Sequence, residues 1–126
     1  YMNDTRLRVS GRYKMIEGLF STGMPFGGRS DLPETLKELG RLLPVCSGVR
    51  RFGAAALDLA YVAAGRYDGF WERNLNAWDI AAGVIIVKEA GGLVEPVTQG
   101  HNIIEDGEVI CANDAMFSQL AKIVRA

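Results

Sequence analysis

Apolar residues along the chain follow two spacings, one typical of strands and one typical of helices. Short stretches with alternating or continuous apolar residues predict strands, and stretches with apolar residues three or four positions apart predict helices. The predicted strands span 6–10, 15–20, 45–47, 67–72, 93–96 and 108–112, and the predicted helices span 32–43, 53–65, 77–91 and 116–124. This order is typical of an α/β fold in which helices flank a sheet.

The helix predicted over 32–43 has clear boundaries. Asp31 is a favourable N-terminal cap, and Pro44 ends the helix. Charged residues such as Glu38 are expected outside the apolar stripe of this helix, whose members recur at helical spacing: Leu32, Leu36, Leu39 and Leu43. We therefore expect the helix to cover the sheet from its solvent side, and we assign no chemistry to it.

The helix predicted over 53–65 begins with the small residues Gly53, Ala54 and Ala55. Small side chains allow a ligand or another backbone to approach the free N–H groups of the first turn, which form the positive end of the helix dipole. Close packing through alanines is the commoner reason for such a run, so both interpretations stay open. The glycine-rich segment 21–29 after a predicted strand is equally compatible with a ligand loop and with a simple connection.

Two acidic residues lie where a strand ends and the next helix begins. Glu72 ends the predicted strand 67–72, and Asp79 opens an uncharged apolar run that lasts until Lys88. Both carboxylates could face one crevice at the carboxyl end of the strand. On the residues alone, a structural interpretation is preferred, in which Glu72 pairs with a nearby arginine and Asp79 caps the helix.

Composition narrows the range of functions. The 126 residues are 48% hydrophobic with a formal net charge of -1, which suits one compact domain and disfavours nucleic acid as a direct partner. Cys46 and Cys111 each lie in an apolar stretch without a nearby Cys or His, so we expect buried, reduced thiols. No apolar run is long enough to span a membrane, and a cytoplasmic location is expected.

Four segments together resemble the inositol monophosphatase family. They are Gly53–Ala56, Gly65–Glu72, Trp78–Gly83 and Glu89–Gly92, and they occur in the order and at the spacing of that family. The resemblance covers essentially all of residues 1–126 but only the carboxyl-terminal half of a family member. It implies a mixed sheet flanked by helices, as part of the layered fold shared with the fructose-bisphosphatase group, and the absence of the amino-terminal catalytic half.

The family resemblance also implies a function and a set of site residues. Family members are Mg²⁺-dependent phosphomonoesterases that act on inositol monophosphate or similar sugar phosphates. By resemblance, Asp79 ligates Mg²⁺, Glu72 accepts a hydroxyl of the substrate ring, and Gly53, Ala54 and Ala55 line the substrate pocket. Oxygen ligands suit this hard cation, and paired metal ions stabilise the attacking and leaving oxygens of phosphoryl transfer.

Two departures from the family pattern limit this expectation. Ala54 replaces the Ser or Thr of many members, which removes a hydroxyl from the edge of the pocket. The other metal-binding acids of the family, in a glutamate pair and an Asp-Pro-x-Asp-Gly-Thr segment, have no counterpart in the chain. We therefore expect no complete catalytic site in these 126 residues, weak Mg²⁺ binding and no phosphatase turnover.

A second functional class stays open beside the enzyme. Some bacterial relatives are thought to act on transcription and RNA processing, so the fold could serve as a non-catalytic dimerisation or protein-docking module. The resemblance further implies a homodimer. Within the enzyme class, the expected partners are a small phosphorylated substrate and the missing amino-terminal half.

Overall fold

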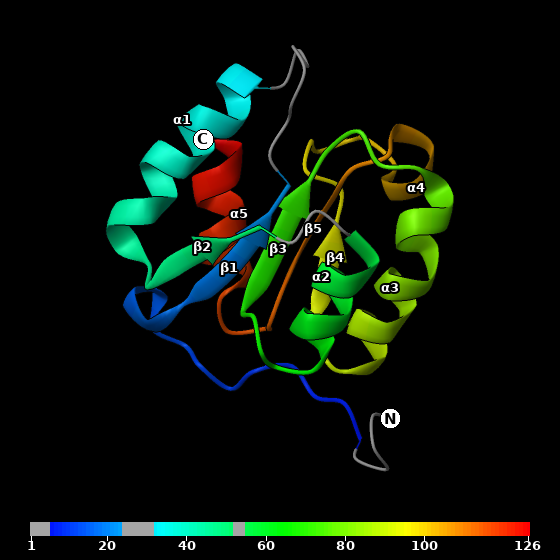
Figure 1. The fold of residues 1–126 in the computed structure, drawn as a ribbon, viewed down its shortest axis with the longest axis horizontal. Helices are drawn as coiled ribbons and strands as arrows, with labels where there is room; N and C mark the ends of the chain where they lie inside the picture. Colours follow the sequence, from blue (N-terminus) through cyan, green and yellow to red (C-terminus); the bar gives the residue numbers. More distant parts are fainter. Residues whose placement is uncertain (1–5, 24–31, 52–54) are drawn as a thin grey trace.

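A five-stranded sheet forms the centre of the computed structural model, which describes residues 6–23, 32–51 and 55–126 (Figure 1). The strands are β1 (Leu19–Thr22), β2 (Gly48–Arg50), β3 (Gly69–Glu72), β4 (Leu93–Glu95) and β5 (Val109–Ala112). The α-helices are α1 (Leu32–Leu42), α2 (Ala55–Ala63), α3 (Ala77–Glu89), α4 (Ile103–Asp106) and α5 (Phe117–Arg125). Two short 3-10 helices, η1 (Met15–Glu17) and η2 (Leu43–Val45), precede β1 and β2.

The sheet is mixed, in the order β2-β1-β3-β5-β4. Strand β1 pairs in parallel with β2 and β3, whereas β5 pairs antiparallel with β3 and β4. The parallel strands β1, β2 and β3 therefore end at one edge of the sheet. The predicted α/β fold with a mixed sheet is confirmed.

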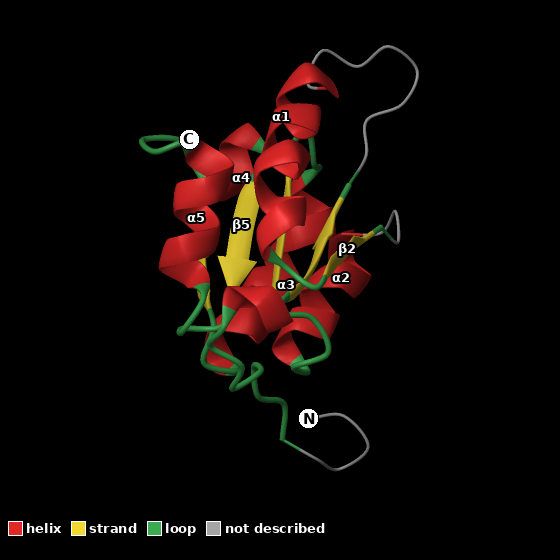
Figure 2. Ribbon diagram, turned by 90° about the vertical axis from the view of Figure 1, so that its left-hand side faces the viewer, coloured by secondary structure: helices red, strands yellow, loops and turns green. Residues whose placement is uncertain are grey.

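Helices cover both faces of the sheet, and alternate residues of each strand point to opposite sides. The face toward α1 and α5 is lined by Phe20, Trp71, Ile110 and Ala112. The face toward α2 and α3 is lined by Phe70, Val109 and Cys111. Figure 2 shows α5 and α2 on opposite sides of the strands. Each face buries its own apolar cluster, and the two clusters share the sheet.

The strand predicted over 6–10 is wrong. Residues 6–14 form no strand, although the Val9 N–H donates to the Ala90 oxygen at the end of α3 (3.1 Å). Leu7 and Val9 pack against the core cluster beneath α2 and α3. Alternating apolar and polar residues indicate that an extended segment has one buried side. They do not indicate whether a neighbouring strand is available to pair with it.

Two further predictions shift when long-range pairing is taken into account, and one short helix was not predicted. The strand predicted over 15–20 is β1, which begins four residues later because Met15–Glu17 forms η1. The strand predicted over 45–47 is replaced by η2 followed by β2. The polar segment after β4 contains α4, whose first N–H groups are capped by the Asn102 side chain. Each of these helices is short, so helical periodicity has little sequence over which to repeat.

Helix α1 is confirmed, but its predicted apolar stripe is only partly right: Leu39 packs against the core cluster, whereas two other leucines of the stripe do not. Leu36 and Leu43 are about half exposed, whereas Glu38, which was expected outside the stripe, is 1% exposed. Leu42 is fully buried and packs in the cluster beneath α1 and α5. The helix is therefore rotated so that the Glu38 carboxylate faces the sheet beside Leu42, while Leu36 points outward. Asp31, the predicted cap, lies outside the described residues.

Helices α2 and α3 are confirmed and pack closely against each other. Gly83 lies in the contact, where an added Cβ would come within 2.8 Å of the Leu59 Cβ. Gly65 ends the α2 segment with φ of +77°, the left-handed conformation expected there. Among the helices that the structure describes, none is both long and apolar enough to cross a membrane.

Candidate functional site

The carboxyl edge of the parallel strands brings the predicted site residues into one region. Helix α2 follows β2 and α3 follows β3, so both helices start at the edge where β1, β2 and β3 end (Figure 1). Glu72 is the last residue of β3, Asp79 lies in the first turn of α3, and Ala55 begins α2. Gly53 and Ala54 lie outside the described residues. Ligands of open α/β sheets bind at this kind of edge.

Glu72 is half-buried on the face of the sheet that packs against α2 and α3. Its side chain lies against Gly23, because a Cβ added to Gly23 would overlap the Glu72 carboxyl group. Of the nearby arginines, Arg73 binds Glu38, and Arg66 lies 5.3 Å from the centre of the Tyr61 ring.

Asp79 is not the cap of α3. Asn76 occupies the N-cap position, and its oxygen accepts the Asp79 N–H at 3.0 Å. The Asp79 side chain is half-exposed, and within residues 6–23, 32–51 and 55–126 it makes no hydrogen bond or ion pair. A carboxylate here lies at the positive end of the helix dipole and keeps its oxygens available for a ligand.

A buried acid that sequence reasoning did not single out lies beneath the start of α2. Asp58 is fully buried, and the Ser21 hydroxyl donates to its Oδ1 at 2.7 Å. No described group donates to its Oδ2. Burial raises the pKa of the Asp58 carboxyl, and the hydrogen bond from Ser21 opposes that shift less strongly. The sequence offered one indication that Asp58 is buried, namely that this aspartate lies in an otherwise apolar predicted helix.

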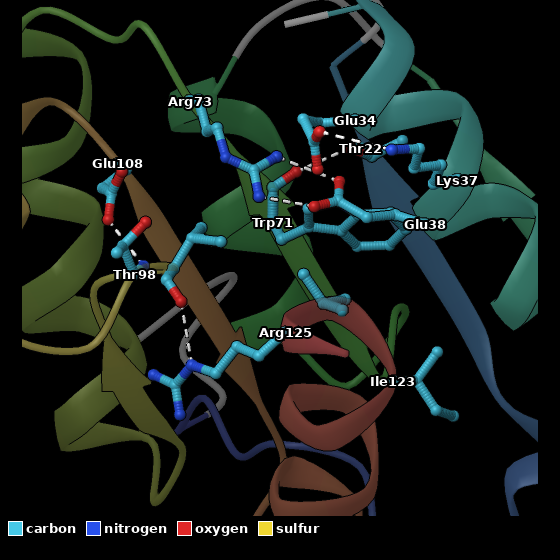
Figure 3. A network of polar contacts seen from close by, with 12 residues as sticks. Thr22, Glu34, Lys37, Glu38, Trp71, Arg73, Thr98, Glu108, Ile123 and Arg125 are labelled. Atoms are coloured by element: carbon cyan, nitrogen blue, oxygen red, sulfur yellow. Dashed lines mark hydrogen bonds and ion pairs between the residues drawn. The ribbon is translucent and has the colours of Figure 1, made fainter.

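Glu38 is a second missed acid, and it is fully paired. Its carboxylate accepts hydrogen bonds from the Trp71 indole and the Arg73 guanidinium (Figure 3). These two residues precede and follow Glu72, the last residue of β3. Hydrogen bonding to Glu38 raises the pKa of Arg73 above its usual value, and burial opposes this. The leucine pattern of α1 gave no indication that Glu38 faces inward.

One metal ligand, but not a complete metal site, is available in the described part of the chain. Asp79 offers carboxylate oxygens of the kind that Mg²⁺ binds. Among the described residues, however, no three side chains of His, Cys, Asp or Glu are grouped as a metal site would require. Among the described residues, Asp79 could therefore supply one carboxylate to a metal ion, but not a full set of ligands.

Residues 1–126 match the sequence model of the inositol monophosphatase family. The chain is 49% identical over 125 residues to an inositol-1-monophosphatase of Mesorhizobium japonicum, covering 99% of the chain and 47% of that relative. It is 45% identical to the Nus factor SuhB of Pseudomonas aeruginosa, covering 98% of the chain and 46% of the relative. The chain thus spans about half the length of these curated relatives.

Solved structures show the same fold. The extragenic suppressor protein SuhB of Bartonella henselae superposes with a TM-score of 0.92 at 44% identity, over 99% of the chain and 48% of that protein. An inositol monophosphatase from Anabaena superposes with a TM-score of 0.84 at 36% identity, over 97% of the chain and 48% of that protein. With a family match over its whole length, the chain belongs to the inositol monophosphatase family.

Proposed function

We propose that the chain is the carboxyl-terminal half of a Mg²⁺-dependent phosphomonoesterase that hydrolyses inositol monophosphate or a similar sugar phosphate. The main support is the placement of Glu72 and Asp79 at one edge of the sheet, where α2 and α3 begin. Relatives named inositol-1-monophosphatase support the reaction class. Because the chain spans about half of those relatives, the activity is proposed for the intact protein.

Each site residue has a distinct proposed role. Asp79 holds one Mg²⁺, and a metal bound there neutralises phosphate charge and lowers the pKa of a coordinated water. Glu72 accepts a hydrogen bond from a ring hydroxyl and so orients the ester. Gly53, Ala54 and Ala55 line the pocket in this proposal, because none of them carries a bulky side chain. Ala54 contributes no hydroxyl, so the identity of the ring depends on other groups.

An amino-terminal half supplies the remaining ligands in this proposal. Its proposed place is the outer side of α2 and α3, where apolar side chains are exposed: Trp78 is 79% exposed, Ile85 58% and Leu57 40%. An apolar surface of this kind next to a half-formed site is typical of an interface. We infer that the 126-residue chain alone binds Mg²⁺ weakly and has no turnover.

The test measures phosphate release from inositol 1-phosphate by the intact protein at increasing Mg²⁺ concentrations. Asp79→Asn is expected to raise the Mg²⁺ concentration needed for half-maximal rate by at least about tenfold, because a ligand is lost. Asp114→Asn, an exposed aspartate before α5, is the matched control and should behave as wild type. A wild-type rate that does not depend on a divalent cation contradicts the proposal.

A second candidate function is a protein-docking or dimerisation module. Its support is the relatives named Nus factor SuhB, at 44–45% identity, and the exposed apolar side chains of α2 and α3. The two functions separate in the Asp79→Asn variant, because a docking module keeps its association while a phosphatase loses its rate. Phosphate release together with size-exclusion chromatography and light scattering, both on the intact wild type and variant, makes this comparison.

A further inference from the structure

We propose that Glu38 is a positioning residue that holds Glu72 in place and thereby sets how strongly the site prefers phosphate esters bearing ring hydroxyls. This inference rests on the proposed function, in which Glu72 accepts a hydrogen bond from the substrate ring. Glu38 itself lies on the opposite face of the sheet and cannot touch the substrate. Its effect is transmitted through the two residues that flank Glu72.

The Glu38 carboxylate binds both neighbours of Glu72 (Figure 3). Its Oε1 accepts the Trp71 indole N–H at 2.9 Å and an Arg73 Nη1–H at 3.0 Å, while Oε2 accepts from Arg73 Nη2. Glu38 and Trp71 are each 1% exposed, and the Arg73 side chain is 21% exposed. All three groups are thus held in one buried, charge-assisted arrangement, which is stronger than an exposed pair.

Strand geometry explains why this arrangement acts on Glu72. Successive side chains point to opposite faces, so Trp71 and Arg73 point toward α1 while Glu72 points toward α2 and α3. The ladder with β5 ends at Glu72, which pairs with Val109. The strand pairing stops at this residue, the chain turns at Asn74 with φ of +60°, and the Leu75 N–H donates to the Gly107 oxygen at 2.8 Å. The Arg73 side chain, held by Glu38, therefore anchors the end of β3 together with this backbone hydrogen bond.

Contacts on the other side restrict Glu72 further. The Thr22 hydroxyl donates to the Trp71 oxygen at 2.7 Å, which ties the end of β1 to β3. Gly23, the next residue, lies so close to the Glu72 carboxyl group that no side chain fits between them. The Glu72 carboxylate is thus bounded by Gly23, which follows β1, and is held from the opposite face of the sheet through its neighbours Trp71 and Arg73.

The surroundings of Glu38 argue against a purely stabilising role. The face beneath α1 and α5 is otherwise lined by apolar side chains such as Phe20, Leu42 and Leu120. A buried ion pair contributes little net stability compared with apolar residues of similar size, although it holds a defined geometry. The presence of the Glu38–Arg73 ion pair at this position is explained by the orientation that the pair imposes on the end of β3.

The test compares two substrates in the intact protein, inositol 1-phosphate and phenyl phosphate, which has no ring hydroxyls. In Glu38→Ala, kcat/KM for inositol 1-phosphate should fall by about tenfold, mainly through KM, because a charge-assisted hydrogen bond is misaligned. The rate with phenyl phosphate should stay unchanged. Glu38→Gln keeps an acceptor for Trp71 and should show a smaller loss.

A double-mutant comparison links the effect to Glu72. Glu72→Gln alone should lower the preference for inositol 1-phosphate, and Glu38→Ala should add no further loss to it, because both changes remove the same contact. Arg41→Gln is the matched control: Arg41 lies on the same helix but binds the Ile123 and Val124 oxygens of α5. Its substrate preference should equal that of wild type.

Several outcomes would overturn the inference. Equal losses with both substrates in Glu38→Ala, or losses that multiply with those of Glu72→Gln, would assign Glu38 a structural role only. If Glu38→Ala does not fold, an unchanged substrate preference in Glu38→Gln overturns it in the same way. An unchanged preference in Glu72→Gln, or a wild type that hydrolyses neither ester, instead refutes the proposed function on which the inference rests.

Discussion

Two buried acids, Glu38 and Asp58, differ in how their charge is compensated. Glu38 is paired with an arginine and an indole, whereas Asp58 receives a hydroxyl at one oxygen and no described donor at the other. Burial without a compensating cation favours the protonated form of a carboxyl group. The raised pKa of Asp58 therefore makes the stability of the fold depend on pH.

The Asp58→Asn variant is expected to lose this pH dependence. Because the pKa of Asp58 is higher in the folded chain than in the unfolded chain, the wild type loses stability as pH rises from about 4 through the raised value. The free energy of unfolding of the variant minus that of wild type should therefore increase from pH 4 to pH 7. The increase is about 1.4 kcal/mol for each unit by which folding raises the pKa.

Urea unfolding at a series of pH values measures this difference. Asp114→Asn is the control, because that side chain is exposed and its removal should give a difference independent of pH. A constant difference for Asp58→Asn as well would show that Asp58 is ionised in the folded chain throughout this range.

The two cysteines are expected to differ in reactivity. Both are free thiols, Cys111 is fully buried in β5, and Cys46 is 8% exposed after η2. Burial raises the pKa of both thiols, so little of either is present as the reactive thiolate. Under native conditions, alkylation followed by mass spectrometry should label Cys46 before Cys111. Equal rates would indicate that labelling requires global unfolding.

At the scale of the elements, two helical glycines should respond in opposite ways to the same change. In Gly83→Ala the new Cβ meets the Leu59 side chain between α2 and α3, which should cost about 1–3 kcal/mol. Gly40 in α1 has nothing within 4 Å of an added Cβ, so Gly40→Ala should stabilise the chain by about 0.5–1 kcal/mol. Thermal unfolding of the pair measures both effects. A stabilising Gly83→Ala would show that the two helices separate easily.

The helices and strands also show which features could be predicted from the local pattern of apolar residues. Helices α2 and α3 and strands β3 and β5 were predicted from continuous apolar runs bounded by turn residues. The orientation of α1 was not fully predicted, because the leucine spacing placed Leu36 in the stripe and Glu38 outside it, whereas Leu36 is exposed and Glu38 is buried. Glu38 turns inward only because Trp71 and Arg73, 33 and 35 residues away, offer it donors.

At the scale of the whole molecule, the proposed division of the active site has a direct test. The purified 126-residue chain should release no phosphate from inositol 1-phosphate at any Mg²⁺ concentration, because its described residues group no three metal ligands. The intact protein assayed in parallel is the positive control. Measurable turnover by the chain, with contaminating phosphatases excluded, would contradict the proposal.

The two tryptophans offer a second test at this scale. Trp71 is 1% exposed, whereas Trp78 is 79% exposed at the start of α3. In the isolated chain, acrylamide should quench Trp78 far more than Trp71, and Trp78→Phe should remove most of the quenchable emission. If an amino-terminal half covers α3 in the intact protein, that quenching should decrease. Equal quenching in both forms would show that Trp78 stays exposed beside the site.

The candidate site combines local and long-range information. The motif around Trp78–Gly83 and the strand ending at Glu72 identify the two carboxylates from sequence. Their common position at one edge depends on β1 and β3 running in parallel, and the space that Glu72 occupies depends on Gly23. Gly53 and Ala54 lie outside the described residues, so their part in the pocket stays a prediction.

The sequence by itself determined the α/β class, most of the helices and the strands β3 and β5. These features depend on local periodicity. The site roles of Glu72 and Asp79 come from the family resemblance and stay a prediction. The tertiary structure alone decided that 6–10 forms no strand, that Asn76 and not Asp79 caps α3, and that Glu38 lies beneath the sheet. Strand pairing and the burial of a charge depend on partners distant in sequence, and the fold alone brings those partners together.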